Sequence, residues 1–254
     1  MLQAERLERI RDYLVANKYA SITELAETFQ TSPATIRRSL KELEKKNIVE
    51  NIRGGAVLRG SGNTFEHPYP IKRKRNETEK KRIANYAASL VCANSSIYLD
   101  ASSTVREMAD SLHNKQGISV CTNDVLIASD LSSAANLVVM VTGGVLRQGF
   151  YSLSGYFTDQ FVSRMQVDYA FMGIDAISKN NGLMLTNIEE IGIKQKIGQH
   201  SGELIVLADH EKFNHTAFLK AWDFSEVALV ITGTELSDEI HDKYIDLGLK
   251  IKRV

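Results

Sequence analysis

Hydrophobic and polar positions alternate with helical spacing in the first 45 residues. Three apolar stripes occur there: Leu7, Ile10 and Leu14; Ile22, Leu25, Ala26 and Phe29; and Ile36, Leu40 and Leu43. Because positions three, four and seven apart share one face of a helix, the stripes predict three amphipathic helices, the first over about residues 3–16. Residues 48–52 and 56–58 then flank Arg53-Gly54-Gly55, which predicts a two-stranded hairpin. Three helices and a hairpin in this order form a winged helix-turn-helix.

Ser21 and Ser32 predict where the second and third helices begin. Ser21 is followed three residues later by Glu24, which fits a capping box. Ser32 precedes Pro33, and proline at the first helical position loses no hydrogen bond because its N–H would have had no partner. The third helix therefore has a defined start.

The third helix has the composition of a DNA-recognition helix. Arg37, Arg38 and Lys41 lie off its apolar stripe and near its N-terminus, as major-groove reading requires. A solvated charged face is the alternative, but the surrounding helices and hairpin favour DNA binding. The residues predicted to contact DNA are Ser21, Thr31, Ser32, Ala34, Thr35, Arg37, Arg38, Lys41 and Arg53.

Charge supports two parts with different roles. The formal net charge of the 254 residues is zero, yet residues 1–82 hold 18 Lys and Arg against 11 Asp and Glu. The remainder holds 13 against 20. A basic front and an acidic back suit a protein that places one end on phosphate.

Beyond residue 76 the pattern becomes an alternation of helices and strands. A helix is expected from Asn76, and strands are expected at residues 97–100, 118–122, 137–142, 169–174, 203–208, 227–232 and 249–254. Such alternation predicts an α/β domain built on a mainly parallel sheet. The predicted organisation is a DNA-binding domain at residues 1–58, a linker at 59–75 and a ligand-binding and oligomerisation domain at 76–254.

The predicted linker is rich in glycine, serine and proline, and it ends in Lys72-Arg73-Lys74-Arg75. This basic run fits a solvated linker face at least as well as a contact to the DNA backbone.

Cys92 and Cys121 lie in apolar runs without metal-ligand spacing, which predicts two buried thiols in a reducing compartment. No apolar run approaches the length of a membrane span, so a cytoplasmic protein, associated with the nucleoid when bound, is expected. No metal and no cofactor is predicted.

Ligands of open parallel sheets bind at the carboxyl ends of the strands, and there the sequence is polar. The hydroxyl-rich turn Asp100-Ala101-Ser102-Ser103-Thr104 follows the first strand and suits an anion. The residues predicted to bind a small-molecule effector are Asp100, Ser102, Ser103, Thr104, Asn123, Gly143, Gly144, Arg147, Asp175, Glu189, Lys194, Asp209 and Lys212. Carboxylates for hydroxyl groups and cations for phosphate predict a phosphorylated sugar or polyol as the ligand.

Over nearly its whole length the chain resembles the DeoR family of bacterial sugar-metabolism regulators. The resemblance rests on Ser32 with Thr35 to Arg38, on Gly54-Gly55-Ala56, and on Leu99-Asp100 through Thr104. It also rests on Thr122-Asn123, Gly143-Gly144, and Ala208-Asp209 with Lys212-Phe213. It implies a DNA-binding repressor of a carbohydrate-utilisation operon, whose effector domain is similar to ribose-5-phosphate isomerase and coenzyme A transferases. Release by a phosphorylated sugar and assembly as a dimer or tetramer are expected.

The chain departs from the family pattern in three places. Ser39 stands where the family usually has Asp, Arg53 and Asn51 stand where it has His and Arg, and Ser102 stands where Gly is common. These changes predict a different base preference, different phosphate contacts of the hairpin, and a ligand that is smaller or uses the Ser102 hydroxyl.

An enzyme is the competing interpretation: a sugar-phosphate isomerase with a DNA-binding headpiece. Asp100, Asp175, Glu189 or Asp209 would then be the general base and Lys194 or Lys212 the electrophile. A protein-binding module is a third possibility, and it would show no salt-sensitive DNA binding. No catalytic residues are predicted in the favoured interpretation.

Overall fold

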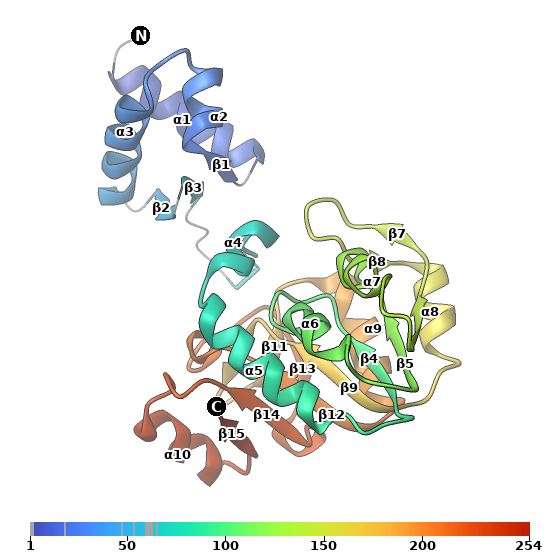
Figure 1. The fold of residues 1–254 in the computed structure, drawn as a ribbon. Helices are drawn as coiled ribbons and strands as arrows, with labels where there is room; N and C mark the ends of the chain where they lie inside the picture. The colour runs from blue at the N-terminus through green and yellow to red at the C-terminus, as the bar shows by residue number, and fades with distance from the viewer. Residues whose placement is uncertain (1–2, 18, 47, 53, 59–62, 65) are drawn as a thin grey trace. The chain divides into compact units, whose positions relative to one another are not determined.

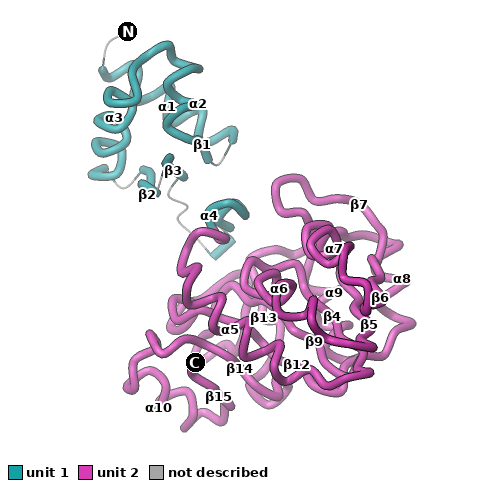
Figure 2. The backbone as a smooth tube through the Cα atoms, viewed as in Figure 1, with its two compact units in different colours: residues 1–71 teal, residues 72–254 magenta. Residues whose placement is uncertain are grey.

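The computed structural model describes residues 3–254 apart from 18, 47, 53, 59–62 and 65. The chain divides into two compact units, an N-terminal unit of residues 1–71 and a C-terminal unit of residues 72–254 (Figure 2). None of the described helices is long and apolar enough to cross a membrane.

The N-terminal unit is a winged helix-turn-helix. Its helices and strands are α1 (Gln3–Asn17), β1 (Tyr19–Ser21), α2 (Ile22–Thr28), α3 (Pro33–Lys45), β2 (Val49–Ile52) and β3 (Gly55–Leu58). The three predicted helices and the hairpin are confirmed. Buried Ile10, Leu25 and Leu40 contribute one side chain from each helix to a common core.

β1 was not predicted from the pattern. It pairs antiparallel with β3, so the strand order is β1-β3-β2. A Cβ at Gly55 would lie 2.4 Å from the carbonyl oxygen of Ala20, so glycine is needed where the two strands meet.

Part of the predicted linker is helical: α4 covers Tyr69–Lys74. The expectation of a solvated face for the basic run is wrong at Lys72, whose half-buried side chain lies 3.0 Å from a carboxylate oxygen of Asp175. This contact joins residues 103 positions apart, so it cannot be predicted from a local sequence pattern.

The C-terminal unit is built on a seven-stranded parallel sheet in the order β15-β14-β12-β9-β4-β5-β6. The strands are β4 (Ser96–Leu99), β5 (Ile118–Thr122), β6 (Leu137–Val141), β9 (Val167–Gly173), β12 (Ser201–Leu207), β14 (Leu229–Thr232) and β15 (Ile251–Arg253). Each falls on one of the seven predicted strand segments. The predicted α/β class with a parallel sheet is therefore confirmed (Figure 1).

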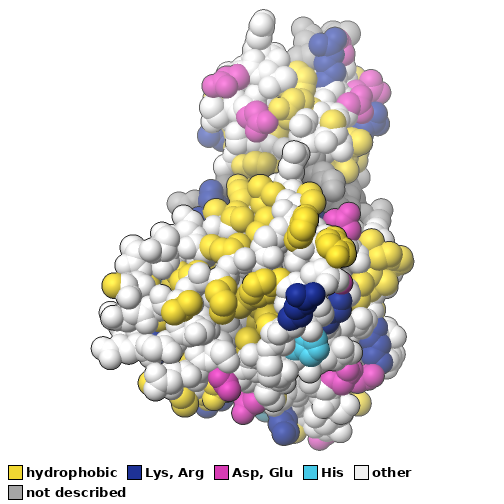
Figure 3. All heavy atoms as spheres, turned by 90° about the vertical axis from the view of Figure 1, so that its right-hand side faces the viewer, with side chains coloured by type: hydrophobic (Ala, Val, Ile, Leu, Met, Phe, Trp, Pro, Cys, Tyr) yellow, Lys and Arg dark blue, Asp and Glu magenta, His cyan; other side chains and the backbone are white. Residues whose placement is uncertain are grey.

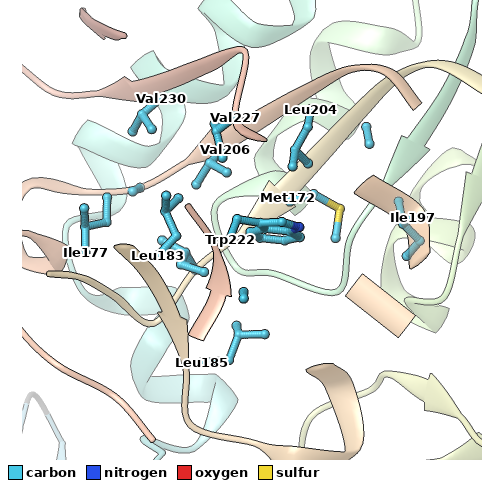
Figure 4. Packing of buried hydrophobic residues seen from close by; sticks show 14 of the residues in the cluster. Met172, Ile177, Leu183, Leu185, Ile197, Leu204, Val206, Trp222, Val227 and Val230 are labelled. Atoms are coloured by element: carbon cyan, nitrogen blue, oxygen red, sulfur yellow. The ribbon is translucent and has the colours of Figure 1, made fainter. Parts of the chain in front are cut away.

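Helices cover both faces of the sheet. One hydrophobic cluster joins it to α5 (Glu77–Leu90), α6 (Met108–Leu112) and α7 (Val125–Leu131), through side chains such as Ile83, Met108 and Ile127. The other joins it to α8 (Tyr156–Val162), α9 (Ile188–Gln199) and α10 (Asp238–Asp246). In this second cluster Trp222 is packed among Met172, Leu204 and Leu183 (Figure 4).

Two small sheets were not predicted. They are the hairpin of β7 (Val145–Leu146) and β8 (Leu153–Ser154), and the sheet of β10 (Ala176–Ser178), β11 (Gly182–Leu185) and β13 (Leu219–Trp222). All four residues of β11 are buried, so the strand shows no alternation of apolar and polar positions.

The prediction for the cysteines is half right. Cys121 is buried in β5, but Cys92 is exposed. Helix α5 ends at Leu90, and buried Val91 is the last residue of that apolar run to reach the core. Cys92 follows in the turn.

Candidate functional site

Helix α3 presents a cationic row to solvent. Arg37, Arg38 and Lys41 are exposed, together with Ala34, while Ile36 and Leu40 face the core. Among the described residues, none forms a hydrogen bond or ion pair with the side chains of Arg37, Arg38 or Lys41. Their charge is therefore available to a partner outside the chain.

The predicted serine caps are present. Ser21 Oγ accepts from the N–H of Glu24 at 3.0 Å, and Glu24 accepts from the N–H of Ser21 at 3.2 Å, which completes the capping box. Ser32 Oγ accepts from the N–H of Thr35 at 3.2 Å and lies 2.9 Å from Thr35 Oγ1. Thr31 is half-buried, directly ahead of the α3 cap. Arg53, also predicted to contact DNA, lies outside the described residues.

Ser39, the departure from the family pattern, is buried between two helices. Its hydroxyl accepts from Arg6 Nε of α1 at 2.9 Å and donates to the carbonyl of Thr35 at 3.1 Å. The side chain thus links α1 to α3 and does not reach the exposed row of cations.

In the C-terminal unit, three carboxylates follow the ends of neighbouring strands. Asp100 comes after β4, Asp175 after β9 and Asp209 after β12, and these strands are adjacent in the order β12-β9-β4. The structure brings these predicted residues together at the carboxyl end of the sheet, as the parallel arrangement requires.

Asp100 and Lys194 form a buried ion pair. Lys194 Nζ donates to Asp100 Oδ2 at 2.5 Å and to the carbonyl of Gly173 at 3.1 Å, and Gly173 N–H donates to the same carboxylate oxygen at 2.9 Å. Burial alone would lower the pKa of Lys194, but Asp100 and Glu190 raise it, so the lysine is charged. The two charges therefore neutralise each other and connect α9 to the ends of β4 and β9.

Three further lysines lie close enough to influence one another's charge; we call Lys72, Lys80 and Lys212 the lysine cluster. Lys80 is only 3% exposed, and its Nζ donates to Ser103 Oγ at 3.2 Å and to the carbonyl of Lys72. Burial, together with the neighbouring Lys212 and Lys72, lowers the pKa of Lys80 to about 8 against the opposing effect of Asp209. A buried ammonium with two cationic neighbours favours an anion.

Asp175 contacts the lysine cluster through Lys72. Its Oδ1 accepts from Lys72 Nζ at 3.0 Å, and its Oδ2 accepts from the N–H and hydroxyl of Thr186 at 3.0 and 2.8 Å. Burial would raise the pKa of Asp175, but Lys72 and Lys212 hold it well below the usual range. Asp209, also buried, accepts from Asn76 Nδ2 at 3.3 Å.

The hydroxyl-rich turn is folded against the strand ends. Ser103 and Thr104 are buried, and Ser102 Oγ accepts from the N–H of Thr104 at 3.3 Å. A Cβ at Gly173 would lie 2.4 Å from the side chain of Ser102. Glycine at position 173 therefore makes room for the serine that replaces the usual glycine at position 102.

The remaining predicted residues have different roles. Asn123 bridges the turn and β8, accepting from Ala101 N–H and donating to the carbonyl of Leu153, each at 3.2 Å. Gly143 and Gly144 have positive φ of 69° and 126°, which favours glycine at both positions. A Cβ on Gly144 would in addition lie 2.5 Å from the carbonyl oxygen of Ser154.

Arg147 and the start of α9 complete the surroundings. Arg147 pairs with Glu190 at 2.9 Å and lies 3.8 Å above the ring of Phe150. Glu189 is exposed, and its neighbour Glu190 is the carboxylate turned toward the site. One residue along a helix changes the direction of a side chain by about 100°.

Lys72 and Lys80 were not predicted as site residues. The sequence did contain an indication that Lys80 is buried. It lies three, four and seven residues before buried Ile83, Ala84 and Ala87, so a lysine occupies the apolar stripe of α5. The sequence contained no such indication for Lys72, because its contact with Asp175 depends on the tertiary fold.

Comparisons with known proteins agree with this arrangement. Residues 6–61 match the DeoR-like helix-turn-helix domain, and residues 75–234 match the DeoR C terminal sensor domain. The HTH-type transcriptional regulator GolR of Listeria innocua is 30% identical over 252 residues, with 99% of each chain covered. The glycerol-3-phosphate regulon repressor of Escherichia coli is 30% identical over 232 residues, with 91% of each chain covered.

A solved structure of ribose 5-phosphate isomerase from Methanocaldococcus jannaschii is also similar, at 18% identity and a TM-score of 0.40, over 54% of this chain and 55% of that one. At this level of similarity nothing follows about a reaction.

Proposed function

We propose that this chain, which belongs to the DeoR family of transcriptional regulators, represses a carbohydrate-utilisation operon and leaves its operator when the C-terminal unit binds a phosphorylated sugar or polyol. The lysine cluster is the observation that carries this proposal. In the described part of the chain no carboxylate lies within ion-pairing distance of Lys80 Nζ, although the side chain is buried. An anionic ligand would supply the missing charge.

The proposed ligand has two chemical parts. Its phosphate binds the lysine cluster and the Ser103 hydroxyl, because cations and O–H donors suit a dianion. Its hydroxyl groups donate to the carboxylates of Asp175 and Asp209. Asp100 and Lys194 hold the strand ends and the Gly173 backbone in position, as their mutual contacts indicate.

Lys72 offers a route from ligand to DNA. It lies on α4, the helix that continues into the N-terminal unit, and its carbonyl accepts from Lys80. A phosphate that draws Lys72 away from Asp175 would shift the end of this helix. We therefore place the start of the functional sensor at Lys72, before the boundary at residue 76 that composition indicated.

An enzymatic role is less well supported by the same contacts. A general base works best when its pKa is near the working pH, whereas the pKa of Asp175 is held well below its usual range. Asp100 is closed off by Lys194. We therefore propose a non-catalytic regulator acting in the cytoplasm, where its operator lies.

Calorimetric titration of the full chain with sugar phosphates and their unphosphorylated parents tests the proposal. At least one phosphorylated compound should bind, its parent should not, and it should weaken binding to DNA from the promoter of neighbouring carbohydrate genes by roughly 5 to 150-fold.

Lys212→Ala removes one cation of the cluster and should weaken the phosphorylated ligand by about 10-fold or more, with DNA binding unchanged in its absence. Lys243→Ala, an exposed lysine of α10 paired with Glu239, is the matched control and should bind normally. Equal binding of parent sugars, or a normal response in Lys212→Ala, would overturn the assignment.

A further inference from the structure

One long stretch of the C-terminal unit is almost without charge. Residues 131–158 contain a single charged side chain, Arg147, although 24% of the chain is charged. Arg147 is itself paired with Glu190. Soluble proteins place most of their charges on the surface, so an uncharged stretch of this length would ordinarily be buried.

This stretch is not buried. It forms β6, β7, β8 and the start of α8, and its exposed apolar side chains are Val138, Met140, Val141, Val145, Leu146, Tyr156 and Phe157. We call these seven residues the edge patch. Val145, Tyr156 and Phe157 are 70%, 72% and 70% exposed. Figure 3 looks onto the side of the C-terminal unit that carries β7 and α8, and hydrophobic atoms are gathered on it.

An open groove of about 570 Å³ adjoins the edge patch at Phe157. Its other lining residues include Gly143, Gly144, Phe161, Arg164 and Met165. Phe161 and Met165 also pack against the hydrophobic cluster beneath, so the groove is continuous with the core.

β6 is also an edge strand. It is the last strand in the order of the parallel sheet and pairs only with β5 among the described strands. Natural proteins protect such edges with lysine, proline or a covering element. The five residues of β6 are Leu137, Val138, Val139, Met140 and Val141, so the strand has no such protection of its own.

The size and composition of the patch fit a protein interface. If each of the seven side chains offers on the order of 100 Å² of apolar surface, the patch amounts to roughly 700 Å², close to the ~800 Å² per partner of a stable interface. Depletion of charge with aromatic and methionine side chains at the centre is typical of interface cores.

We propose that the edge patch is the surface through which two copies of this chain associate. A two-fold interface brings each side chain near its own equivalent, so like charges at its centre would repel, and none of the seven side chains of the edge patch is charged. Pairing of β6 with β6 of the second copy would satisfy both open edges. Two copies also supply the two headpieces that a symmetric operator requires.

Sedimentation equilibrium of the full chain tests the proposal. The wild-type chain is a dimer or a larger even assembly at micromolar concentration, and Met140→Lys is a monomer because two buried ammonium groups would meet across the axis. The matched control is Ile245→Lys, which places the same charge on an exposed isoleucine of α10 outside the patch. It stays assembled.

Mixing two variants of opposite charge provides a second test of the interface. Met140→Glu alone is a monomer, whereas an equimolar mixture of Met140→Lys and Met140→Glu assembles. A monomeric wild-type chain, or a Met140→Lys chain that assembles like Ile245→Lys, overturns the proposal. A wild-type chain that associates only with a different protein overturns it too.

Ligand and DNA measurements on the same samples separate this proposal from the proposed function. Met140→Lys keeps its affinity for the phosphorylated sugar and loses operator affinity at least 10-fold. If no sugar phosphate binds the wild-type chain while Met140→Lys dissociates it, the ligand assignment fails and the interface stands.

Discussion

The two units of this protein use basic side chains in opposite ways. In the N-terminal unit, Arg37, Arg38 and Lys41 are exposed and pair with none of the described residues. In the C-terminal unit, Lys80 and Lys194 are buried, one beside two other lysines and the other against Asp100. The three cations of α3 remain in water, whereas these two lysines of the C-terminal unit are removed from it.

The difference has an energetic meaning. An exposed arginine costs the fold almost nothing, so it is free to meet phosphate and its effect is screened by salt. A buried lysine is costly unless a carboxylate or ligand compensates it, and salt screens it little. Changes to the first group should alter binding alone, and changes to the second should alter stability as well.

The largest effect is expected at the buried pair. Lys194→Ala leaves the Asp100 carboxylate buried without its cation and should lower the free energy of unfolding of the C-terminal unit by about 3–5 kcal/mol. Urea denaturation followed by the fluorescence of Trp222, the single tryptophan, measures this unit directly. The double variant Asp100→Asn/Lys194→Met should lose less than Lys194→Ala, and an unchanged midpoint in Lys194→Ala would contradict a structural role for the pair.

The second effect is on DNA. Arg37→Ala/Arg38→Ala should weaken operator binding by about 30-fold or more, because each base contact contributes roughly 1–3 kcal/mol. The melting temperature should not change, since both side chains are exposed. Arg9→Ala, an exposed arginine of α1 paired with Glu5, is the control. Normal affinity in the double variant would refute α3 as the recognition helix.

The third effect depends on pH through Lys80. Its pKa of about 8 means that it loses its charge above that pH. Affinity for a phosphorylated ligand should therefore fall above pH 8, by at most tenfold per pH unit, while the phosphate itself stays a dianion. Calorimetry between pH 7 and 9.5 measures this fall, which should be absent in Lys80→Met.

Stability should respond to the same group in the opposite sense. Because the folded-state pKa of Lys80 lies below its ordinary 10.5, its charge destabilises the ligand-free fold below pH 8. That penalty should disappear as the pH rises from about 8 toward 10.5.

Equal ligand affinity at pH 7 and 9.5 in the wild-type chain would exclude Lys80 from the site.

The smallest effect is expected at Ser39. Ser39→Ala removes the hydrogen bonds to Arg6 and to the Thr35 carbonyl and should lower the stability of the N-terminal unit by about 1 kcal/mol. Operator affinity should stay within twofold because the hydroxyl is buried. A large loss of DNA affinity without a change in melting would show that Ser39 acts on the DNA face.

Sequence patterns predicted most of the fold. The three N-terminal helices were recognisable because their caps and apolar stripes are local, as the capping box of Ser21 and Glu24 shows. The seven strands of the parallel sheet were recognisable as short apolar runs between helices. The small sheet of β10, β11 and β13 was not, because every residue of β11 is buried and no alternation remains.

The candidate ligand site was predictable only in part. Asp100, Asp175 and Asp209 could be expected near one another because the carboxyl ends of parallel strands lie on the same side of the sheet. Their partners could not be assigned, since Lys72 and Asp175 are 103 positions apart and Lys194 and Asp100 are 94. Glu189 and Glu190 could not be separated without the rotation of α9.

Sequence patterns were enough to predict the two-part organisation, helix α3 with its exposed basic side chains, and the strand ends that carry polar side chains, because these depend on periodicity and on neighbours within a few residues. The folded structure was needed to show that Lys80 and Lys194 are buried, that Lys72 contacts Asp175, and that the uncharged stretch after residue 130 lies on the surface. Burial and long-range pairing depend on which segments meet, and only the folded chain brings them together.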